Sequence, residues 1–191
     1  MDVFSHGLWS VVIYKGANLK VKQQMRAWLA VVFGIFPDVF AFTPLFVQLF
    51  WGLIFGSLSF SDFPRPVETE PARQDTFLIF KITSALYSFS HSLIIFLIIF
   101  GIAYLIFKRP IWEMFAWLLH ILIDIPTHSY KFYPTPFLWP ISNFKFDGFL
   151  WSEPWFMILN YSALAIVFIL LRKKYKERKI LNLDYEKIKP R

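Results

Sequence analysis

The sequence contains no cysteine among its 191 residues. Disulfide bonds and thiolate metal ligands are therefore both excluded. Charged residues are also scarce, at 17% of the chain, whereas hydrophobic residues reach 57%. Soluble domains average about 45–50% apolar residues. The composition therefore indicates a protein that exposes much of its surface to lipid.

Several catalytic and targeting signatures are missing as well. The sequence has no G-x-S-x-G nucleophile motif, no phosphate-binding loop and no dinucleotide fingerprint. Its first residues lack the basic start and the small-residue cleavage site of a signal peptide, so no cleavable signal is expected. These absences leave the long apolar segments, and the few polar residues inside them, as the main sources of information.

Long apolar runs predict a helical membrane protein. A helix needs about 20 apolar residues to cross the hydrocarbon core of a bilayer. The runs that meet or approach this length are 27–60, 91–107, 111–125 and 155–171. Pro37 and Pro44 are expected to break the first run into one span and a shorter element. We predict an all-α fold, a polytopic membrane helical bundle with about four to five membrane-embedded helices.

Positive charge is concentrated at the carboxyl end of the chain. The formal net charge is +7, and residues 172–191 hold nine Lys or Arg against three Asp or Glu, a net +6. Basic residues beside a span mark the cytoplasmic side of a membrane, so nucleic acid is not an expected partner. We predict a membrane-embedded domain over 1–171, a basic cytoplasmic tail over 172–191, and location in the plasma (inner) membrane. Membrane lipid is the expected partner, and the tail is either solvated or in contact with anionic lipid.

The same charge rule orients the other segments. Span 155–171 runs inward from an outside loop, 111–127 runs outward, and 91–107 runs inward. Residues 15–26 include four basic residues and no acid, which places them in the cytoplasm. Residues 61–75 include four acids and two arginines, which places them outside. These assignments agree and predict a multi-pass protein with a cytoplasmic carboxyl terminus.

All four histidines lie in or beside apolar segments, and two aspartates share that setting. These residues are His6, His91, His120, His128, Asp38 and Asp124. An ionisable residue within a membrane segment marks a functional site by default. The competing interpretation is a set of interhelical hydrogen bonds that stabilises the bundle, worth about 1 kcal/mol each.

Three of these residues share one spacing. His120, Asp124 and His128 stand four residues apart, and steps of four lie on one stripe of an α-helix. Pro126 disfavours a helix that continues to His128, so His120 and Asp124 are expected on the stripe, and His128 joins them only if the helix continues. The H-x-x-x-D pair is weak evidence alone and gains weight from the other buried histidines.

A predicted hairpin adds two more residues to this group. Arms over 4–14 and 27–37 would place His6 beside Asp38 at about half the depth of the bilayer. Imidazole with carboxylate, without sulfur, suits Zn, Mn or Fe(II) better than Cu. These positions are compatible with a single metal site in the outer half of the membrane.

The segments that contain these residues resemble a known family. "MDVFSHGL", "GIFPDVF", "FSHSL" and "HILIDIPTHS", with the later "FLWPIS", resemble the YdjM-like family of inner-membrane proteins, which are inferred to be metal-dependent hydrolases. The resemblance covers most of 1–142. The family is in turn distantly similar to zinc-dependent phospholipases C and single-strand nucleases, which are all-helical enzymes. The resemblance implies metal ligands at His6, Asp38, His91, His120 and Asp124, with His128 similar to a further histidine of the phospholipases.

Two departures reduce the implied set of ligands. Phe40 stands where the family often has a second acid, and "LYSFSHS" has neither His nor Arg where the family often has H-R before T-H-S. The resemblance therefore implies one or two divalent ions rather than three. Zinc is the first expectation and manganese the second.

The predicted function is hydrolysis of a phosphoester or an ester by a membrane-bound metal-dependent enzyme, with a lipid or another small molecule as substrate. A bound ion would lower the pKa of water and polarise a phosphoryl or acyl oxygen. Asp38 or Asp124 would act as the general base. The alternatives are a non-enzymatic metal-binding or transport membrane protein, and a scaffold whose basic tail binds a partner. Hydroxyl groups flank the histidines and either fix ring orientations or satisfy nearby backbone groups: they belong to Ser5, Ser90, Ser92 and Thr127.

Overall fold

The computed structural model describes residues 1–56, 59 and 78–188, with side chains described as far as residue 180. Its elements, in chain order, are α1 (Val3–Asn18), α2 (Ala27–Ile54), α4 (Leu78–Ser90), α5 (Leu93–Phe107), the 3-10 turn η2 (Trp112–Met114), α6 (Phe115–Thr127) and α7 (Pro154–Ile188). No strand occurs in the described part of the chain, so the all-α prediction is confirmed. The predicted outside loop 61–75 lies outside the described residues.

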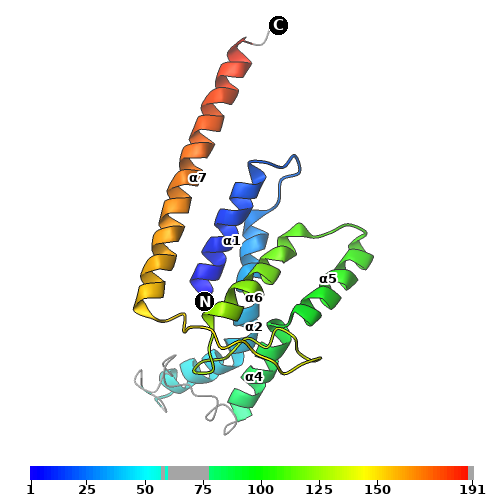
Figure 1. Ribbon diagram of the computed structural model, residues 1–191, viewed down its shortest axis with the longest axis vertical. Helices are drawn as coiled ribbons and strands as arrows, with labels where there is room; N and C mark the ends of the chain where they lie inside the picture. The colour runs from blue at the N-terminus through cyan, green and yellow to red at the C-terminus, as the bar shows by residue number, and fades with distance from the viewer. Residues whose placement is uncertain (57–58, 60–77, 189–191) are drawn as a thin grey trace.

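Helices α1 and α2 form the predicted hairpin, and its arms are longer than expected (Figure 1). The two backbones approach closely at Gly34, where a Cβ atom would collide with the Ser10 hydroxyl. Small residues allow such an approach between membrane helices. The hairpin thereby brings the first turns of α1 against the middle of α2.

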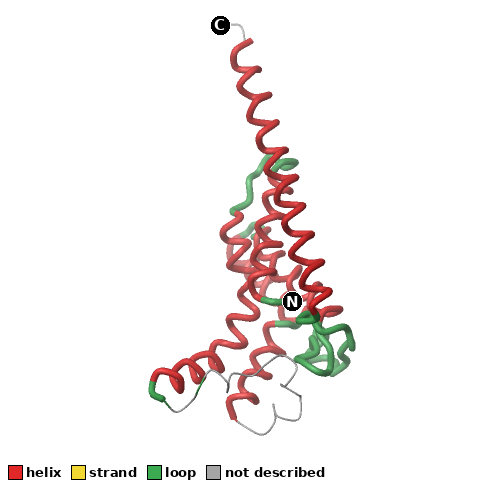
Figure 2. The backbone as a smooth tube through the Cα atoms, turned by 90° about the vertical axis from the view of Figure 1, so that its left-hand side faces the viewer, coloured by secondary structure: helices red, strands yellow, loops and turns green. Residues whose placement is uncertain are grey.

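Helix α2 continues through both of its prolines, so the predicted break at Pro37 and Pro44 is wrong. Each proline removes one helical N–H donor, which bends a helix more often than it ends one inside a packed bundle. The second half of α2 changes direction in both views (Figures 1 and 2). Ser90 of α4 donates a hydrogen bond to the Pro37 carbonyl at 3.1 Å.

Helices α4 and α5 replace the single predicted span that began at His91. They meet at an angle of 60°, and His91 and Ser92 form the break. The Ser92 hydroxyl caps α5 by accepting hydrogen bonds from the backbone N–H groups of Ile94 and Ile95 at 3.1 and 3.2 Å. His91 is therefore held at a corner rather than along a regular helix.

Helix α7 packs beside α1 and extends well beyond the other helices (Figures 1 and 2). It is continuous from Pro154 to Ile188 and therefore crosses the predicted boundary between 171 and 172 without a break. The basic segment therefore begins as the exposed end of this helix.

Within the described residues, two helices are long and apolar enough to cross a membrane, Ala27–Ile54 and Pro154–Ile180, or three if the bent pair α4 and α5 forms one span. This number is lower than the predicted four to five. The reason is length, because α1 has 16 residues and α6 has 13, whereas a full crossing takes about 20.

Candidate metal centre

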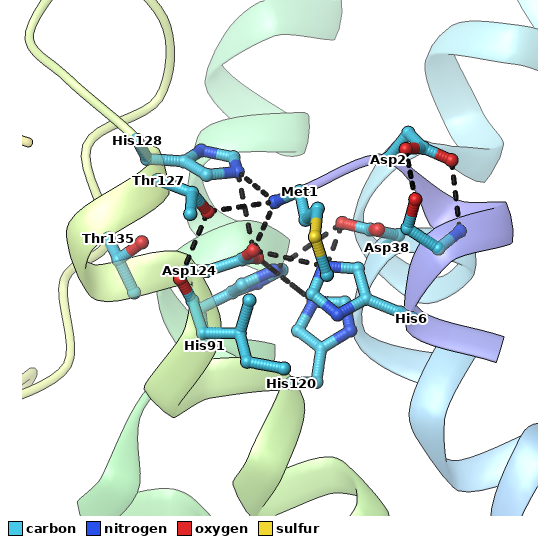
Figure 3. Close-up of polar contacts among 12 residues, drawn as sticks. Met1, Asp2, His6, Asp38, His91, His120, Asp124, Thr127, His128 and Thr135 are labelled. Atoms are coloured by element: carbon cyan, nitrogen blue, oxygen red, sulfur yellow. Dashed lines mark hydrogen bonds and ion pairs between the residues drawn. The ribbon is translucent and has the colours of Figure 1, made fainter. Parts of the chain in front are cut away.

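Three helices and two residues that adjoin helix ends bring the six predicted side chains to one place (Figure 3). They come from α1 (His6), α2 (Asp38), the break before α5 (His91), α6 (His120 and Asp124) and the residue after α6 (His128). None of the six is more than 4% exposed. Because buried polar groups need partners, their contacts decide what the cluster can do.

Asp38, His91, His120 and Asp124 form a group that could hold a metal ion. One ligand atom from each lies within 4.8 Å of all the others. The chemistry of this set, two imidazoles with two carboxylates, is that of zinc and of other divalent transition metals. The predicted pairing of His120 with Asp124 is therefore part of a larger buried group.

Asp124 lies at the centre of the cluster. Its Oδ1 lies 2.9 Å from Nε2 of His6 and 3.6 Å from Nε2 of His128. Its Oδ2 lies 3.1 Å from Nε2 of His120 and 3.5 Å from Nε2 of His91. All four imidazoles therefore present the same ring nitrogen to one carboxylate.

Backbone carbonyls hold three of these rings in that orientation. Nδ1 of His120 lies 2.6 Å from the Gly34 carbonyl oxygen. The corresponding distances are 3.2 Å from His91 to the Tyr87 carbonyl and 2.9 Å from His128 to the Tyr133 carbonyl. A carbonyl can only accept, so this network assigns the proton to Nδ1 and leaves the Nε2 lone pair facing the cluster. Metal-binding histidines are held in this way in proteins generally.

Several atoms of the cluster lack a hydrogen bond although they are close together. Within the described part of the chain, Nδ1 of His6 has no hydrogen-bond partner, and Nε2 of His6 and Oδ2 of Asp124 have none apart from the imidazole–carboxylate contacts given above. Nε2 of His91 lies 3.1 Å from Nε2 of His120, and with both protons on Nδ1 two lone pairs would face each other. A cation between these atoms would remove both problems, so the residues fit a metal ion.

A positive group already contacts one side of the cluster. The amino group of Met1 contacts Oδ1 of Asp124 and lies 3.2 Å from the Thr127 hydroxyl and 3.0 Å from Nε2 of His128 (Figure 3). This contact lies on the Oδ1 side of Asp124, where His6 and His128 also lie.

The segment after α6 folds back and docks on the end of α6. Backbone N–H groups of Gly148, Phe149 and Trp151 donate to the last carbonyls of α6 and to that of His128, at 2.9–3.0 Å. A Cβ atom on Gly148 would collide with the carbonyls of Pro126 and His128. Glycine is therefore required where this loop docks.

Tyr87 contacts two histidines of the cluster but was not predicted from the sequence. Its ring stacks on His91 with centroids 3.7 Å apart, and its hydroxyl lies 3.2 Å from Nδ1 of His128. The hydroxyl also donates to the Tyr133 carbonyl at 3.0 Å. Its position four residues before His91 was a usable signal, because residues so spaced share a helix face.

The flanking hydroxyl groups divide between the two expected roles. Ser90 lies 2.9 Å from Nδ1 of His91 and so supports that ring. Thr127 donates to the Ile123 carbonyl at 2.9 Å, which serves the backbone of α6. Ser92 caps α5, as described above.

An apolar groove of about 360 Å³ lies between α1, η2 and α6, lined by residues such as Ile13, Trp112 and Leu119. None of the six clustered residues lines it. The groove therefore does not open into the centre in this structure.

Comparison with known proteins gives one result. The family model for the YdjM inner membrane protein matches residues 1–183. No curated protein and no solved structure matches the chain. The match extends through all elements that carry the cluster and into the basic part of α7. The chain therefore belongs to the YdjM inner membrane protein family.

Proposed function

We propose that this protein is a membrane-bound metal-dependent hydrolase that cleaves a phosphoester or an ester. One observation carries the proposal: four Nε2 atoms and two carboxylates meet in a buried cluster in which several atoms lack hydrogen bonds. Leaving buried polar atoms unpaired is unfavourable in a purely structural network. The same arrangement is favourable when a cation is bound.

The ligands of the proposed ion are Asp38, His91, His120 and Asp124. His6 and His128 lie on the Oδ1 side of Asp124 and would complete the coordination of this ion or hold a second one. We propose zinc first and manganese second, with one or two ions per chain. A bound divalent ion would supply Lewis acidity that lowers the pKa of water and polarises a phosphoryl or acyl oxygen.

Asp38 is the better placed general base of the two aspartates. Its Oδ1 lies 3.5 Å from Nε2 of His91 and 3.7 Å from Nε2 of His120, whereas Asp124 makes closer contacts on both oxygens. A carboxylate that is less engaged as a ligand is freer to accept a proton. Asp124 would mainly hold the ion and the surrounding imidazoles.

The proposed location is the inner membrane, with several crossings and a cytoplasmic carboxyl terminus. Tyr175 of α7 donates to the Lys15 carbonyl at 2.8 Å, and Arg178 donates to the Leu19 carbonyl at 3.0 Å. The two most basic segments therefore lie side by side, at the end away from loop 128–153 (Figure 1). This arrangement supports a common cytoplasmic side, with α1 and α6 entering the membrane part of the way.

A lipid is the proposed substrate class, because the centre lies among membrane helices, and nucleic acid is not a proposed partner. The distant similarity to zinc-dependent phospholipases C and single-strand nucleases stays a prediction. The burial of all six residues also favours a second candidate function, metal binding without catalysis, because a closed centre admits no substrate without movement of the surrounding segments.

The first test of the proposal measures the metal content of the purified protein. The wild-type chain and a His120→Ala/Asp124→Ala variant, purified in detergent and offered zinc or manganese, would be compared by elemental mass spectrometry. Leu122→Ala is the control, since Leu122 is on the same helix and exposed. We expect about one or two ions per chain in the wild type and control and none in the double variant. Equal metal content in all three would refute the metal centre.

The second test measures hydrolytic activity. Loaded wild-type protein would be offered phosphoester and ester lipids, with Asp38→Asn as the matched variant. Turnover that depends on metal and falls at least 100-fold in Asp38→Asn, with metal retained, supports hydrolysis by general base catalysis. Bound metal without turnover of either class would favour the second candidate function.

A further inference from the structure

The amide of Asn160 joins α7 to the first turns of α1. Asn160 is 4% exposed within the otherwise apolar part of α7. The indole N–H of Trp9 donates to its Oδ1 at 2.9 Å, and its Nδ2 donates to the Ser5 hydroxyl at 2.7 Å. An indole nitrogen can only donate, so it determines which end of the amide faces Ser5.

The network continues to the residue that begins α1. The Ser5 hydroxyl donates to Oδ2 of Asp2 at 2.5 Å, and the Ser5 backbone N–H donates to Oδ1 at 3.0 Å, which makes Asp2 the N-cap of the helix. Tyr161, the residue after Asn160, donates to the same Oδ1 at 2.9 Å. Two consecutive residues of α7 therefore fix the start of α1.

His6 follows Ser5 directly, and it differs from the other histidines in how it is held. The rings of His91, His120 and His128 each have Nδ1 on a backbone carbonyl. Neither ring nitrogen of His6 has a hydrogen bond to a backbone carbonyl. Its ring stacks on His120, with centroids 3.6 Å apart, and its Nε2 lies 2.9 Å from Oδ1 of Asp124. The direction of its Nε2 therefore depends on where α1 itself is held.

We propose that Asn160 is a positioning residue of the metal centre, which holds the first turn of α1 so that Nε2 of His6 faces Asp124. The inference rests on the proposed metal site, and it adds a residue of α7, a helix that contributes none of the six clustered side chains. Residues that orient ligands in this way typically change metal affinity by about 10–100-fold when they are mutated.

The test measures zinc affinity of the full-length protein in detergent by competition with a chromophoric chelator, together with the visible spectrum of the cobalt(II)-loaded protein. Asn160→Ala is compared with Ser162→Ala, an exposed position on the same helix. We expect Asn160→Ala to weaken zinc binding about 10-fold or more and to change the cobalt spectrum, and Ser162→Ala to change neither. Equal behaviour of the two variants overturns the inference.

A second arm asks whether Asn160 acts through His6. In a His6→Ala background, Asn160→Ala should cause no further loss of zinc affinity. A further loss as large as in the wild-type background would mean that Asn160 supports the whole bundle and would overturn the inference. If Asn160→Ala does not fold, Trp9→Phe replaces it, since this change removes only the indole donor to Asn160. Weaker zinc binding by Trp9→Phe would support the inference. Unchanged zinc binding would overturn it. If the wild-type protein binds neither zinc nor cobalt(II), the proposed function and this inference are refuted together. If Asn160→Ala binds zinc as tightly as the wild type does, only this inference is refuted.

Discussion

Gly34→Ala should destabilise the protein and weaken its metal centre at the same time. Gly34 lies where α1 and α2 touch, and its carbonyl accepts from Nδ1 of His120 at 2.6 Å. A Cβ at this position would collide with the Ser10 hydroxyl and would lie 3.1 Å from Ser10 Cβ and 3.3 Å from the His6 carbonyl oxygen. The helices would have to separate, and the separation would move both His6 and the group that orients His120.

The expected magnitude follows from the tightness of this contact. Overpacking a well-packed core costs about 1–3 kcal/mol, and for a chain of this size 1 kcal/mol corresponds to about 2–4 °C in Tm. Gly34→Ala should therefore lower the unfolding temperature by roughly 2–12 °C. Zinc affinity should fall by about 10-fold or more, as for other groups that orient a ligand.

Gly101→Ala provides the matched control. Gly101 lies inside α5, and a Cβ there would meet nothing within 4 Å. Alanine is a better helix former than glycine by about 1 kcal/mol, so this variant should be unchanged or slightly more stable. Adding Ser10→Gly to Gly34→Ala should restore part of the lost stability. The measurements are thermal unfolding in detergent and zinc competition, and equal results for Gly34→Ala and Gly101→Ala would refute the reasoning.

Three further predictions concern the ion, a supporting ring and the loop. A chelator should lower the unfolding temperature of the wild type but not of His120→Ala/Asp124→Ala, because it removes the bound metal ion. A ligand present at 100 times its Kd stabilises the folded state by about 2.7 kcal/mol. An equal shift of the unfolding temperature in both proteins would contradict a specific site. Tyr87→Phe should keep the stack on His91 but lose the hydroxyl contact with His128, and should weaken zinc binding by up to about 10-fold, which competition titration would measure. Gly148→Ala should increase proteolysis of loop 128–153, because its Cβ would collide with two carbonyls of the docking site; protection equal to that of the wild type would show that the loop adjusts.

The residues of the centre could be identified from the sequence because their type is improbable in an apolar chain. Histidine and aspartate at membrane depth are rare without a function. The predicted hairpin of 4–14 and 27–37 was enough to place His6 beside the second arm. Which atom of each residue faces the centre could not be predicted. The partners that orient His91, His120 and His128 are backbone carbonyls, and no sequence pattern specifies which carbonyl a side chain will meet.

The number of spans was harder to predict than the ligands, because apolar composition does not reveal where a helix ends. The runs at 3–18 and 115–127 are apolar, but the helices they form are too short to cross a membrane. In the opposite sense, Pro37 and Pro44 are strong breakers in sequence, yet packing against α4 and α6 keeps α2 helical through both. Tertiary contacts therefore decided these boundaries against local propensity.

The break between α4 and α5 has no helix-breaking residue, since the sequence "FSHSL" contains neither proline nor glycine. Its cause is the set of partners that satisfy the freed backbone groups. Trp117 donates its indole N–H to the Ser90 carbonyl at 2.6 Å, and the Phe137 carbonyl accepts from the Leu93 N–H at 2.9 Å. Irregular backbone inside a membrane protein is tolerated only where such groups are paired within the protein. A straight helix would make its own backbone hydrogen bonds but would leave His91 on a regular helix face. The break therefore places His91 at a corner, where its ring nitrogen reaches both aspartates of the centre.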